Sequence, residues 1–256
     1  MFKKKSLGQH FLRSQGALAA VAAAADIVPG ETVVEIGPGE GALTEHLLAV
    51  GARVVAIEKD HRLIPLLKEK FAGKKFTVYE ADALETDLET LEVRGTYKIV
   101  GNIPYYITGA LIRKFLTVTE QPSVLVFLVQ KEVAERIARS KKESILSLSV
   151  KAYGNPRYVK KVPRGAFVPP PKVDSAILLV TDISRKHFTS TTHEQLFFDL
   201  LHAGFGSKRK LLVRNLEKIL GPDTPEAFAH ANIPHNARAE DVPLTQWLTL
   251  ASYPKK

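Results

Sequence analysis

The sequence predicts an α/β protein with a mostly parallel sheet covered by helices on both faces, followed by a small all-α domain. Two observations support this prediction. Over about the first 140 residues, short apolar runs rich in β-branched residues alternate with longer amphipathic segments, whereas only helical patterns follow residue 183. In addition, 45% hydrophobic and 25% charged residues over 256 positions are typical of a folded chain long enough for two domains.

The elements of the first domain follow from apolar periodicity. Strands are expected at residues 32–36, 53–57, 76–79, 97–100, 123–129 and 176–180. Helices are expected between them, at residues 41–50, 60–71, 108–116 and 131–140. This order builds βαβ units, whose strands run parallel and whose ligands bind beyond the carboxyl ends of the strands. The segments that follow the strands are therefore where chemistry is sought.

The second domain is expected after a proline-rich turn at residues 167–171 and the last strand. Helical patterns then cover residues 194–203, 208–220, 225–231 and 244–252. We therefore predict a catalytic domain over residues 1–183, with a basic arm at 1–13, and a small helical domain over 184–256.

The charge is distributed unevenly along the chain. The net charge of +9 divides into +4 for residues 1–13, −2 for residues 14–150 and +7 for residues 151–256. Basic segments on either side of a nearly neutral body favour binding of a polyanion, because Lys and Arg release counterions from phosphates. A solvated basic surface is the alternative explanation.

The sequence also indicates where the protein acts and whether it binds a metal. The apolar stretch at residues 17–25 is far too short to span a membrane, and polar residues after Lys3, Lys4 and Lys5 interrupt any signal-peptide pattern. The chain has no cysteine, which excludes disulfides and thiolate metal sites and fits a reducing compartment. Its eight histidines lack metal-ligand spacing. We therefore expect a cytoplasmic protein without a metal.

A glycine-rich turn at residues 35–41 follows the first strand. Glycines at Gly37 and Gly39 let a ligand approach the backbone closely. Glu58, at the end of the second strand, is placed to accept hydrogen bonds from the ribose hydroxyls of a nucleoside cofactor. Gly37, Gly39 and Ala42 also satisfy the dinucleotide pattern G-x-G-x-x-A, so a nicotinamide-dependent dehydrogenase remains open.

The ends of the third and fourth strands add polar and aromatic groups. Asp82 is placed to hydrogen-bond an adenine amino group, although a helix-capping aspartate would look similar. The segment Asn102-Ile103-Pro104-Tyr105 follows the fourth strand. The Asn102 oxygen and a backbone carbonyl near Ile103 or Pro104 can accept the two hydrogens of an adenine N6, which aims its lone pair at an electrophilic methyl group. Tyr105 supplies a flat face on which an extruded base can stack.

These motifs resemble the KsgA-type ribosomal RNA adenine dimethyltransferases, and the likeness extends along nearly the whole chain. The segments that carry it are residues 6–12, 35–39, 102–105, 130–134, 167–175 and 238–240, together with Glu58 and Asp82.

The resemblance implies a Rossmann-like S-adenosylmethionine-dependent methyltransferase that dimethylates N6 of adjacent adenines in small-subunit (16S-type) ribosomal RNA. It implies S-adenosyl-L-methionine as cofactor, S-adenosyl-L-homocysteine as product, and ribosomal RNA or an assembling small subunit as partner of a monomer. The cofactor-binding residues it implies are His10, Leu12, Gly37, Gly39, Glu58, Asp82 and Asn102. The catalytic residues it implies are Asn102, Pro104, Tyr105 and Phe167, of which Phe167 would stack on the target base opposite Tyr105.

A basic run supplies candidate RNA contacts in the second domain. Lys208, Arg209 and Lys210, with Arg214 about one helical turn later, are expected to present several cations from one end of a helix as a phosphate clamp. A solvated helix face is the alternative. Lys3, Lys4, Lys5, Lys160, Lys161 and Arg164 are further candidates.

One segment departs from the family pattern, and two related functions stay open. Residues 140–145 replace a stretch in which the family carries glycine and tyrosine, which puts RNA contacts there in question; His10 also stands where many members have asparagine. The alternatives are a large-subunit adenine methyltransferase of the antibiotic-resistance type and a non-catalytic RNA-binding assembly or transcription factor on the same fold. Residues 169–175 and 238–240 favour the small-subunit enzyme.

Overall fold

The computed structural model describes residues 10–91 and 93–254, and the chain divides into two compact units. The first unit comprises residues 1–135 and 155–183, and the second comprises residues 136–154 and 184–256. A break after residue 183 is therefore present, but residues 136–154 group with the second unit instead of belonging to one domain over 1–183. The reason is packing: Leu148 and Ala152 are buried in the hydrophobic cluster of the second unit.

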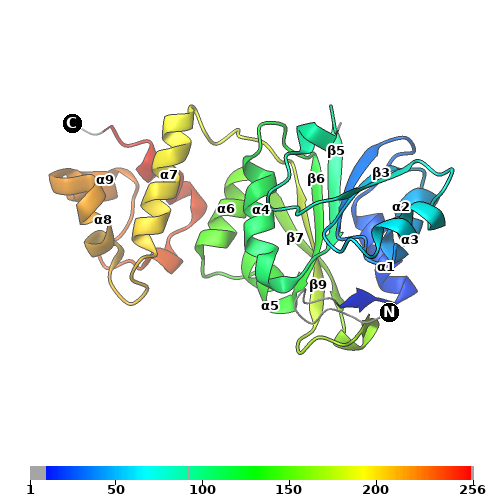
Figure 1. Ribbon diagram of the computed structural model, residues 1–256. Coiled ribbons are helices and arrows are strands. Elements are labelled where there is room, and N and C mark those ends of the chain that lie inside the picture. The colour runs from blue at the N-terminus through cyan, green and yellow to red at the C-terminus, as the bar shows by residue number, and fades with distance from the viewer. Residues whose placement is uncertain (1–9, 92, 255–256) are drawn as a thin grey trace. The chain divides into compact units, whose positions relative to one another are not determined.

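The first unit is built on a seven-stranded sheet (Figure 1). The strands are β2 (Thr32–Ile36), β3 (Arg53–Glu58), β4 (Phe76–Glu80), β5 (Tyr97–Asn102), β6 (Val124–Gln130), β7 (Asn155–Val162) and β9 (Ser175–Thr181), in the order β4-β3-β2-β5-β6-β9-β7. The first five strands of that order are parallel to their neighbours, whereas β9 and β7 are antiparallel. The mostly parallel sheet is thus confirmed, and β7 is an edge strand that was not predicted.

Helices cover both faces of this sheet (Figure 1). They are α1 (Gln15–Ala24), α2 (Ala42–Ala49) and α3 (Ile64–Lys70) toward one side, and α4 (Thr108–Thr117) and the start of α5 (Lys131–Ala138) toward the other. α1, which was not predicted, begins after Ser14, whose hydroxyl accepts a hydrogen bond from the Ala17 N–H as an N-cap. α3 begins at Ile64 and not at residue 60, because the Leu63 N–H bonds the Asp60 carbonyl in a turn.

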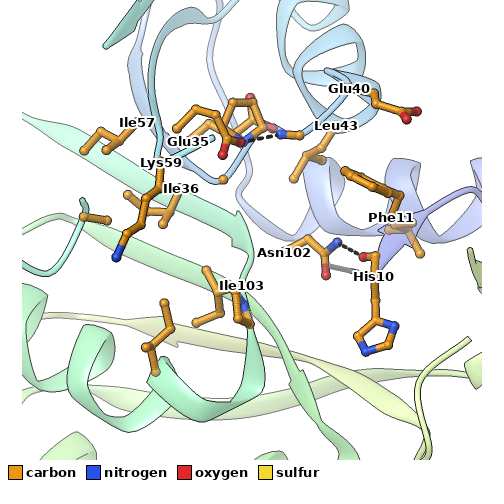
Figure 2. A pocket seen from close by; sticks show the side chains of 18 of the residues that line it. His10, Phe11, Glu35, Ile36, Glu40, Leu43, Ile57, Lys59, Asn102 and Ile103 are labelled. Carbon is orange, nitrogen blue, oxygen red and sulfur yellow. Dashed lines mark hydrogen bonds between the residues drawn. The ribbon is translucent and has the colours of Figure 1, made fainter. Parts of the chain in front are cut away.

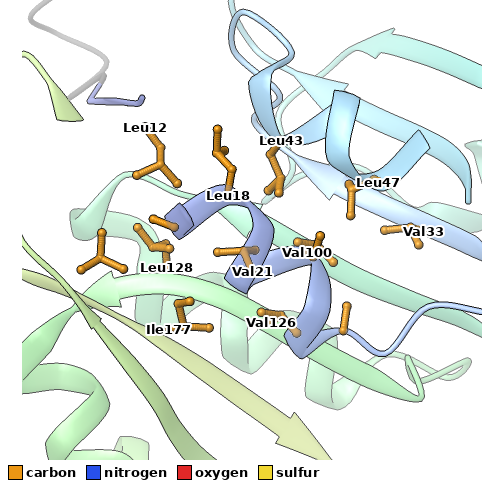
Figure 3. Packing of buried hydrophobic residues seen from close by; sticks show 14 of the residues in the cluster. Leu12, Leu18, Val21, Val33, Leu43, Leu47, Val100, Val126, Leu128 and Ile177 are labelled. Carbon is orange, nitrogen blue, oxygen red and sulfur yellow. The ribbon is translucent and has the colours of Figure 1, made fainter. Parts of the chain in front are cut away.

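The main core of this unit lies between α1, α2 and the sheet. Figure 3 shows Leu18 and Val21 of α1 beside Val126 and Leu128 of β6, and all four side chains are buried. A short two-stranded sheet, β1 (Phe11–Leu12) with β8 (Phe167–Val168), pairs Phe11 with Val168 and Leu12 with Phe167. The ladder brings the N-terminal segment against the proline-rich turn, 155 residues away along the chain (Leu12 to Phe167).

The second unit is all helical in the part that the structure describes. It contains α6 (Ile145–Tyr153), α7 (Thr191–Gly204), α8 (Leu212–Leu220), α9 (Thr224–His230) and α10 (Leu244–Ala251), packed around the buried Trp247. The four C-terminal helices were predicted, and α6 was not. α8 begins at Leu212, so Lys208, Arg209 and Lys210 lie in the turn before the helix and not on it as expected. The turn is closed by a hydrogen bond from the Lys210 N–H to the Ser207 carbonyl.

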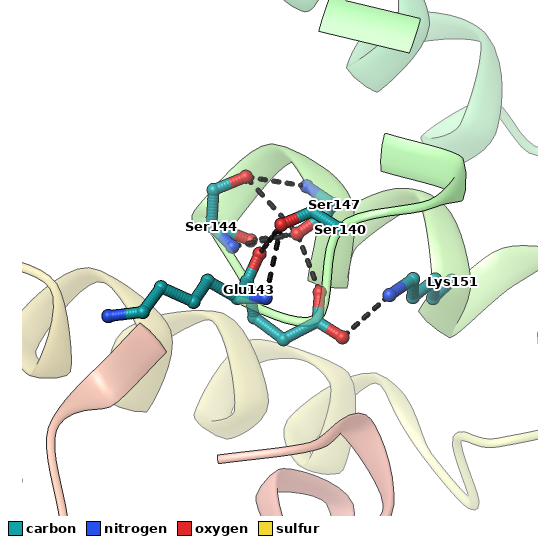
Figure 4. Close-up of polar contacts among 6 residues, drawn as sticks. Ser140, Glu143, Ser144, Ser147 and Lys151 are labelled. Atoms are coloured by element: carbon teal, nitrogen blue, oxygen red, sulfur yellow. Dashed lines mark hydrogen bonds and ion pairs between the residues drawn. The ribbon is translucent and has the colours of Figure 1, made fainter. Parts of the chain in front are cut away.

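Polar contacts around Glu143 form the start of α6 (Figure 4). Glu143 accepts a hydrogen bond from the Ser147 hydroxyl at 2.7 Å and pairs with Lys151 at 2.6 Å, while Ser144 and Ser147 form a capping box. The Glu143 N–H donates to the carbonyl of Glu240, whose carboxylate pairs with Lys142. The segment that departs from the family pattern is thus a helix cap joined to residue 240.

None of the helices in the described ranges combines the length and apolar character needed to cross a membrane.

Candidate active site

A pocket of about 220 Å³ opens at the carboxyl ends of the central parallel strands (Figure 2). It gathers residues from the N-terminal segment and from the segments that follow β2, β3, β4 and β5. Its polar and aromatic walls include His10, Phe11, Arg13, Glu35, Gly37, Gly39, Glu40, Glu58, Lys59, Asp82, Asn102, Pro104, Tyr105 and Tyr106, and Leu12 also lines it. The strand-end residues singled out from the sequence therefore meet in one cavity.

The turn after β2 forms one wall of the pocket with its backbone exposed to it. Gly37 and Gly39 have φ angles of +65° and +59°, which residues with a Cβ rarely adopt. A Cβ added to Gly39 would lie 2.9 Å from the Phe11 ring. The close contact between the Gly39 backbone and this ring therefore also requires glycine. The wall is therefore a narrow backbone cradle, the shape needed by a ligand that lies against the main chain.

Glu58 is fixed at the end of β3. Its carboxylate accepts hydrogen bonds from the Gly39 N–H at 3.0 Å and the Asp60 N–H at 2.8 Å. Burial raises the pKa of Glu58, and these two hydrogen bonds act in the opposite direction. A carboxylate has about four acceptor sites, so Glu58 can still receive hydroxyl groups from a ligand.

Glu35, the residue two positions before Gly37, is a site residue to which sequence analysis gave no role of its own. It is 1% exposed and lines the pocket. One carboxylate oxygen accepts the Thr44 hydroxyl at 2.6 Å, while Oε1 is buried without a partner. Burial, supported by the nearby charge of Glu58, raises the pKa of Glu35 to about 8 against the Thr44 bond. A buried acceptor without a donor is costly, and a cationic ligand group in the pocket would relieve that cost.

Asp82, in the turn after β4, lies in the pocket wall with both oxygens engaged. Oδ1 accepts the Leu84 N–H at 2.9 Å, and Oδ2 pairs at 2.6 Å with Lys59, which directly follows β3. The Lys59 hydrogen bond lowers the pKa of Asp82, so the carboxylate is charged at neutral pH. A ligand amino group that binds Asp82 would share the carboxylate with Lys59. The sequence around Asp82 gave no indication of this neighbour.

Asn102 ends β5 with its amide oriented by the N-terminal segment (Figure 2). Its Nδ2 donates to the His10 carbonyl at 2.9 Å, which leaves Oδ1 as an acceptor at the other end of the amide. The Pro104 carbonyl accepts the Ile107 N–H, the hydrogen bond that forms the 3₁₀ turn Tyr105–Ile107. Of the two carbonyls considered from the sequence, the Pro104 oxygen already accepts one hydrogen bond, which favours the Ile103 oxygen as the second acceptor.

Tyr105 is held at both its hydroxyl and its ring. The hydroxyl shares a 2.6 Å hydrogen bond with the buried Ser175 of β9, and burial raises its pKa. The His10 ring lies 6.2 Å away between centroids at an interplanar angle of 23°. His10 is itself held by the Pro169 carbonyl, 2.8 Å from Nδ1. Tyr105 therefore presents a fixed aromatic surface to the pocket.

Phe167 does not line the pocket that Tyr105 lines. It is 2% exposed and belongs to the core cluster with Leu12. Because Leu12 and Phe167 are directly paired in the β1–β8 ladder, their side chains lie on the same face, and this face packs into the core. Its stacking on a target base stays a prediction, and in this structure the side chain is buried in the core.

Arg13 and Glu40 form an ion pair at the pocket, joining the N-terminal segment to the glycine turn. The Arg13 N–H also donates to the Ala166 carbonyl at 2.8 Å. The N-terminal segment from His10 to Arg13 thus contacts the glycine turn, Asn102 and the proline-rich turn. Lys3, Lys4 and Lys5 of the predicted arm lie outside the described residues.

The candidate RNA-binding residues of the second unit are exposed. Lys208, Arg209, Lys210 and Arg214 lie before and within the first turns of α8, and Arg214 is 3.4 Å from Glu217. In the first unit, Lys161 pairs with Asp174 at 2.8 Å, which reduces its value as a phosphate ligand. Within residues 10–91 and 93–254, no group of three or more His, Cys, Asp or Glu side chains is arranged to hold a metal ion.

The arrangement suits the transfer of a group between two bound ligands. It positions the ligands and offers no side chain as a covalent nucleophile within the described pocket lining. It offers a backbone cradle, acidic groups along one wall, an amide acceptor and an aromatic face in sequence. Such a site acts by orientation and by hydrogen bonds to the reacting groups.

Comparison with known proteins extends this result to the whole chain. A family model described as ribosomal RNA adenine dimethylase matches residues 1–256. A relative from Dehalococcoides mccartyi, ribosomal RNA small subunit methyltransferase A, is 45% identical over 255 residues, covering 96% of this chain and 87% of that protein.

Two solved structures are similar in fold. A dimethyladenosine transferase from Plasmodium falciparum has a TM-score of 0.80 at 28% identity, covering 94% of this chain and 96% of that one. The 23S rRNA methyltransferase ErmE has a TM-score of 0.77 at 29% identity, covering 94% of this chain and 98% of that one.

Proposed function

The chain belongs to the ribosomal RNA adenine dimethylase family, and we propose that it dimethylates N6 of adjacent adenines in small-subunit ribosomal RNA during ribosome biogenesis. The observation that carries the proposal is the convergence of Glu58, Asp82, Asn102 and Tyr105 in one pocket at the strand ends. We propose S-adenosyl-L-methionine as the methyl donor held there, with S-adenosyl-L-homocysteine as product and no metal required.

The residues that line the pocket support a place for each part of that cofactor. The glycine turn and the unpartnered Oε1 of Glu35 suit the amino-acid end, because an ammonium group there would stabilise the charged carboxylate, whose pKa burial raises in the free protein. Glu58 is proposed to bind the ribose hydroxyls, and Asp82 the adenine amino group. His10 and Leu12 line the same cavity and are proposed to contact the cofactor.

When bound, the cofactor supplies an electrophilic methyl group on sulfonium sulfur. Asn102 Oδ1 and the Ile103 carbonyl are proposed to accept the two N6 hydrogens of the target adenine, which directs the nitrogen lone pair at that methyl. In the transfer, the new N–C bond would form as the S–C bond of the donor breaks, and the proton of the methylated amine would pass to water. Orientation of this kind contributes up to about 7–11 kcal/mol in favourable cases. Pro104 fixes the turn and offers no competing N–H.

Tyr105 is proposed to stack on the adenine after it leaves its helix. Its hydroxyl bond to Ser175 holds the ring in place for that contact. A stacking role for Phe167 would require it to leave the core cluster in the RNA complex.

The exposed cations Lys208, Arg209, Lys210 and Arg214 are proposed to contact RNA phosphates, which place the RNA without reading its sequence. The residues before 184 are proposed to form the catalytic part, apart from residues 136–154, which group with the second unit, and those from 184 to 256 the RNA-binding part. We further propose that the protein acts in the cytoplasm as a monomer on ribosomal RNA or an assembling small subunit.

The test is methyl transfer from labelled S-adenosylmethionine to small and large ribosomal subunits that lack adenine dimethylation. Wild type is compared with Asn102→Ala and with the control Asn155→Ala, which alters an asparagine on the edge strand β7. We expect dimethyladenine in the small subunit with wild type and the control, and a loss of at least about 100-fold with Asn102→Ala.

Other outcomes would separate the rival functions. Label only in the large subunit would favour the resistance-type enzyme. Cofactor binding without transfer to either subunit would favour a binding factor, and binding of a nicotinamide dinucleotide in place of S-adenosylmethionine would contradict the proposal.

A further inference from the structure

The turn that carries Asp82 into the pocket is a compact hydrogen-bonded unit. The Asp82 carbonyl accepts the N–H groups of Glu85 and Thr86 and the Thr86 hydroxyl, and its Oδ1 accepts the Leu84 N–H. Asp82, Ala83 and Leu84 line the pocket. These bonds fix the shape of the turn, but they do not fix its position relative to the rest of the site.

Lys114 supplies that connection from α4. Its Nζ donates to the Leu84 carbonyl at 2.9 Å and to the Thr86 carbonyl at 2.5 Å. Both acceptors lie outside any helix or strand, so their oxygens need donors from elsewhere. An ammonium has three donors and no acceptor, which suits two converging carbonyls.

The base of Lys114 is itself well anchored. α4 follows the Asn102–Ile107 segment directly, and its neighbours Leu111, Ile112 and Phe115 are fully buried. Burial lowers the pKa of Lys114, whereas the carboxylates of Glu85, Asp87 and Asp82 act in the opposite direction. Lys114 does not line the pocket, so any effect on a ligand must pass through the turn.

We propose that Lys114 is a positioning residue that holds the Asp82–Thr86 turn where Asp82 and Leu84 meet the adenine end of the cofactor. This inference rests on the proposed use of S-adenosylmethionine. Lys114 also links the Asp82–Thr86 turn to α4, the helix that follows the Asn102–Ile107 segment. The turn proposed to bind the cofactor and the segment proposed to bind the target base are therefore both connected to α4.

The inference is tested by calorimetric titration of two ligands. S-adenosylhomocysteine has both the adenosine and the amino-acid end, whereas 5′-methylthioadenosine lacks the amino-acid end. We expect Lys114→Met to raise the Kd of both ligands by the same factor, about tenfold, which corresponds to about 1.4 kcal/mol. Lys114→Arg, which keeps the charge and several donors, should recover most of the affinity.

Lys131→Met is the matched control, because the Lys131 side chain forms an ion pair with the half-buried Glu135 at 3.1 Å and does not line the pocket. Its two Kd values should equal those of wild type. Circular dichroism at the titration temperature establishes that each variant is folded, and Lys114→Gln replaces Lys114→Met if the latter does not fold, with the same expected loss.

A Kd within twofold of wild type for the folded variant would overturn the inference. So would a loss confined to S-adenosylhomocysteine, since that would place the effect at the amino-acid end. Failure of wild type to bind either ligand would instead contradict the proposed function, and the inference with it.

Discussion

Glu35→Gln should make the free energy of unfolding less dependent on pH. Burial raises the pKa of Glu35 to about 8, from 4.5 for an ordinary glutamate. Between these values the folded chain binds a proton that the unfolded chain releases, so this contribution to stability is complete below about pH 4.5 and is lost as pH rises toward 8. Each pH unit in the window removes about 1.4 kcal/mol, or about 3 kcal/mol between pH 5 and 7.5.

The measurement is urea denaturation of wild type and variant, without ligand, at pH 5, 6, 7 and 8. The amide that replaces the carboxyl group in Glu35→Gln does not titrate, so the variant should gain stability relative to wild type at each step toward pH 8. A difference between the two proteins that stays constant from pH 5 to 8 would refute the reasoning. Comparing the two proteins at each pH cancels the contribution of most other ionisable groups.

Glu31→Gln is the matched control. Although burial opposes it, the hydrogen bonds from Lys98 and the Val28 N–H lower the pKa of Glu31. A lowered pKa gives stability above about pH 4.5 that is lost only as pH falls further. The difference between Glu31→Gln and wild type should therefore be the same at pH 5 and pH 8.

Two glycine substitutions give further predictions. Gly39→Ala should weaken S-adenosylmethionine binding at least tenfold in a calorimetric titration, because its Cβ would meet the Phe11 ring at 2.9 Å and its φ is +59°; Gly165→Ala, with open space around it, should have no effect, and equal Kd values for both variants would contradict this account. Gly204→Ala should lower the stability of the second unit by about 1–3 kcal/mol, because its Cβ would lie 2.5 Å from the ring of Trp247. Trp247 is the single tryptophan, so its fluorescence during denaturation reports this unit directly, and an unchanged midpoint would show that the helices adjust without cost.

The sequence predicted the fold where apolar patterns were strong and missed it where they were weak. The central parallel strands and the four C-terminal helices carry clear periodicity. β7 does not, because Pro156 and the basic residues Arg157, Lys160 and Lys161 interrupt its pattern. Proline and charge are typical of an edge strand, which needs protection against pairing with another chain. α6 was missed for a different reason: its serines are weak helix formers, and Ser144 and Ser147 act instead as its cap.

The site was predictable to the extent that parallel strands bring their carboxyl ends together. Glu58, Asp82 and Asn102 were identified by that rule and meet in one pocket. This rule does not identify Lys114, whose partners are backbone carbonyls 28 and 30 residues earlier in the chain. Every residue has a backbone carbonyl, so the sequence does not mark these two as partners. The pairing of Lys59 with Asp82 likewise depends on the distance between two neighbouring strand ends.

The surroundings of Tyr105 show why a motif does not determine which groups face each other. The resemblance implied Phe167 as the second aromatic wall, but the β1–β8 register turns this side chain with Leu12 into the core. The ring beside Tyr105 is that of His10, which the Pro169 carbonyl holds from the same proline-rich turn. A base that stacks on Tyr105 therefore lies near the His10 ring, whereas contact with Phe167 would require that side chain to leave the core. Because β1 begins directly after His10, whose carbonyl accepts the hydrogen bond of Asn102, a movement of the ladder would also change the orientation of the Asn102 amide.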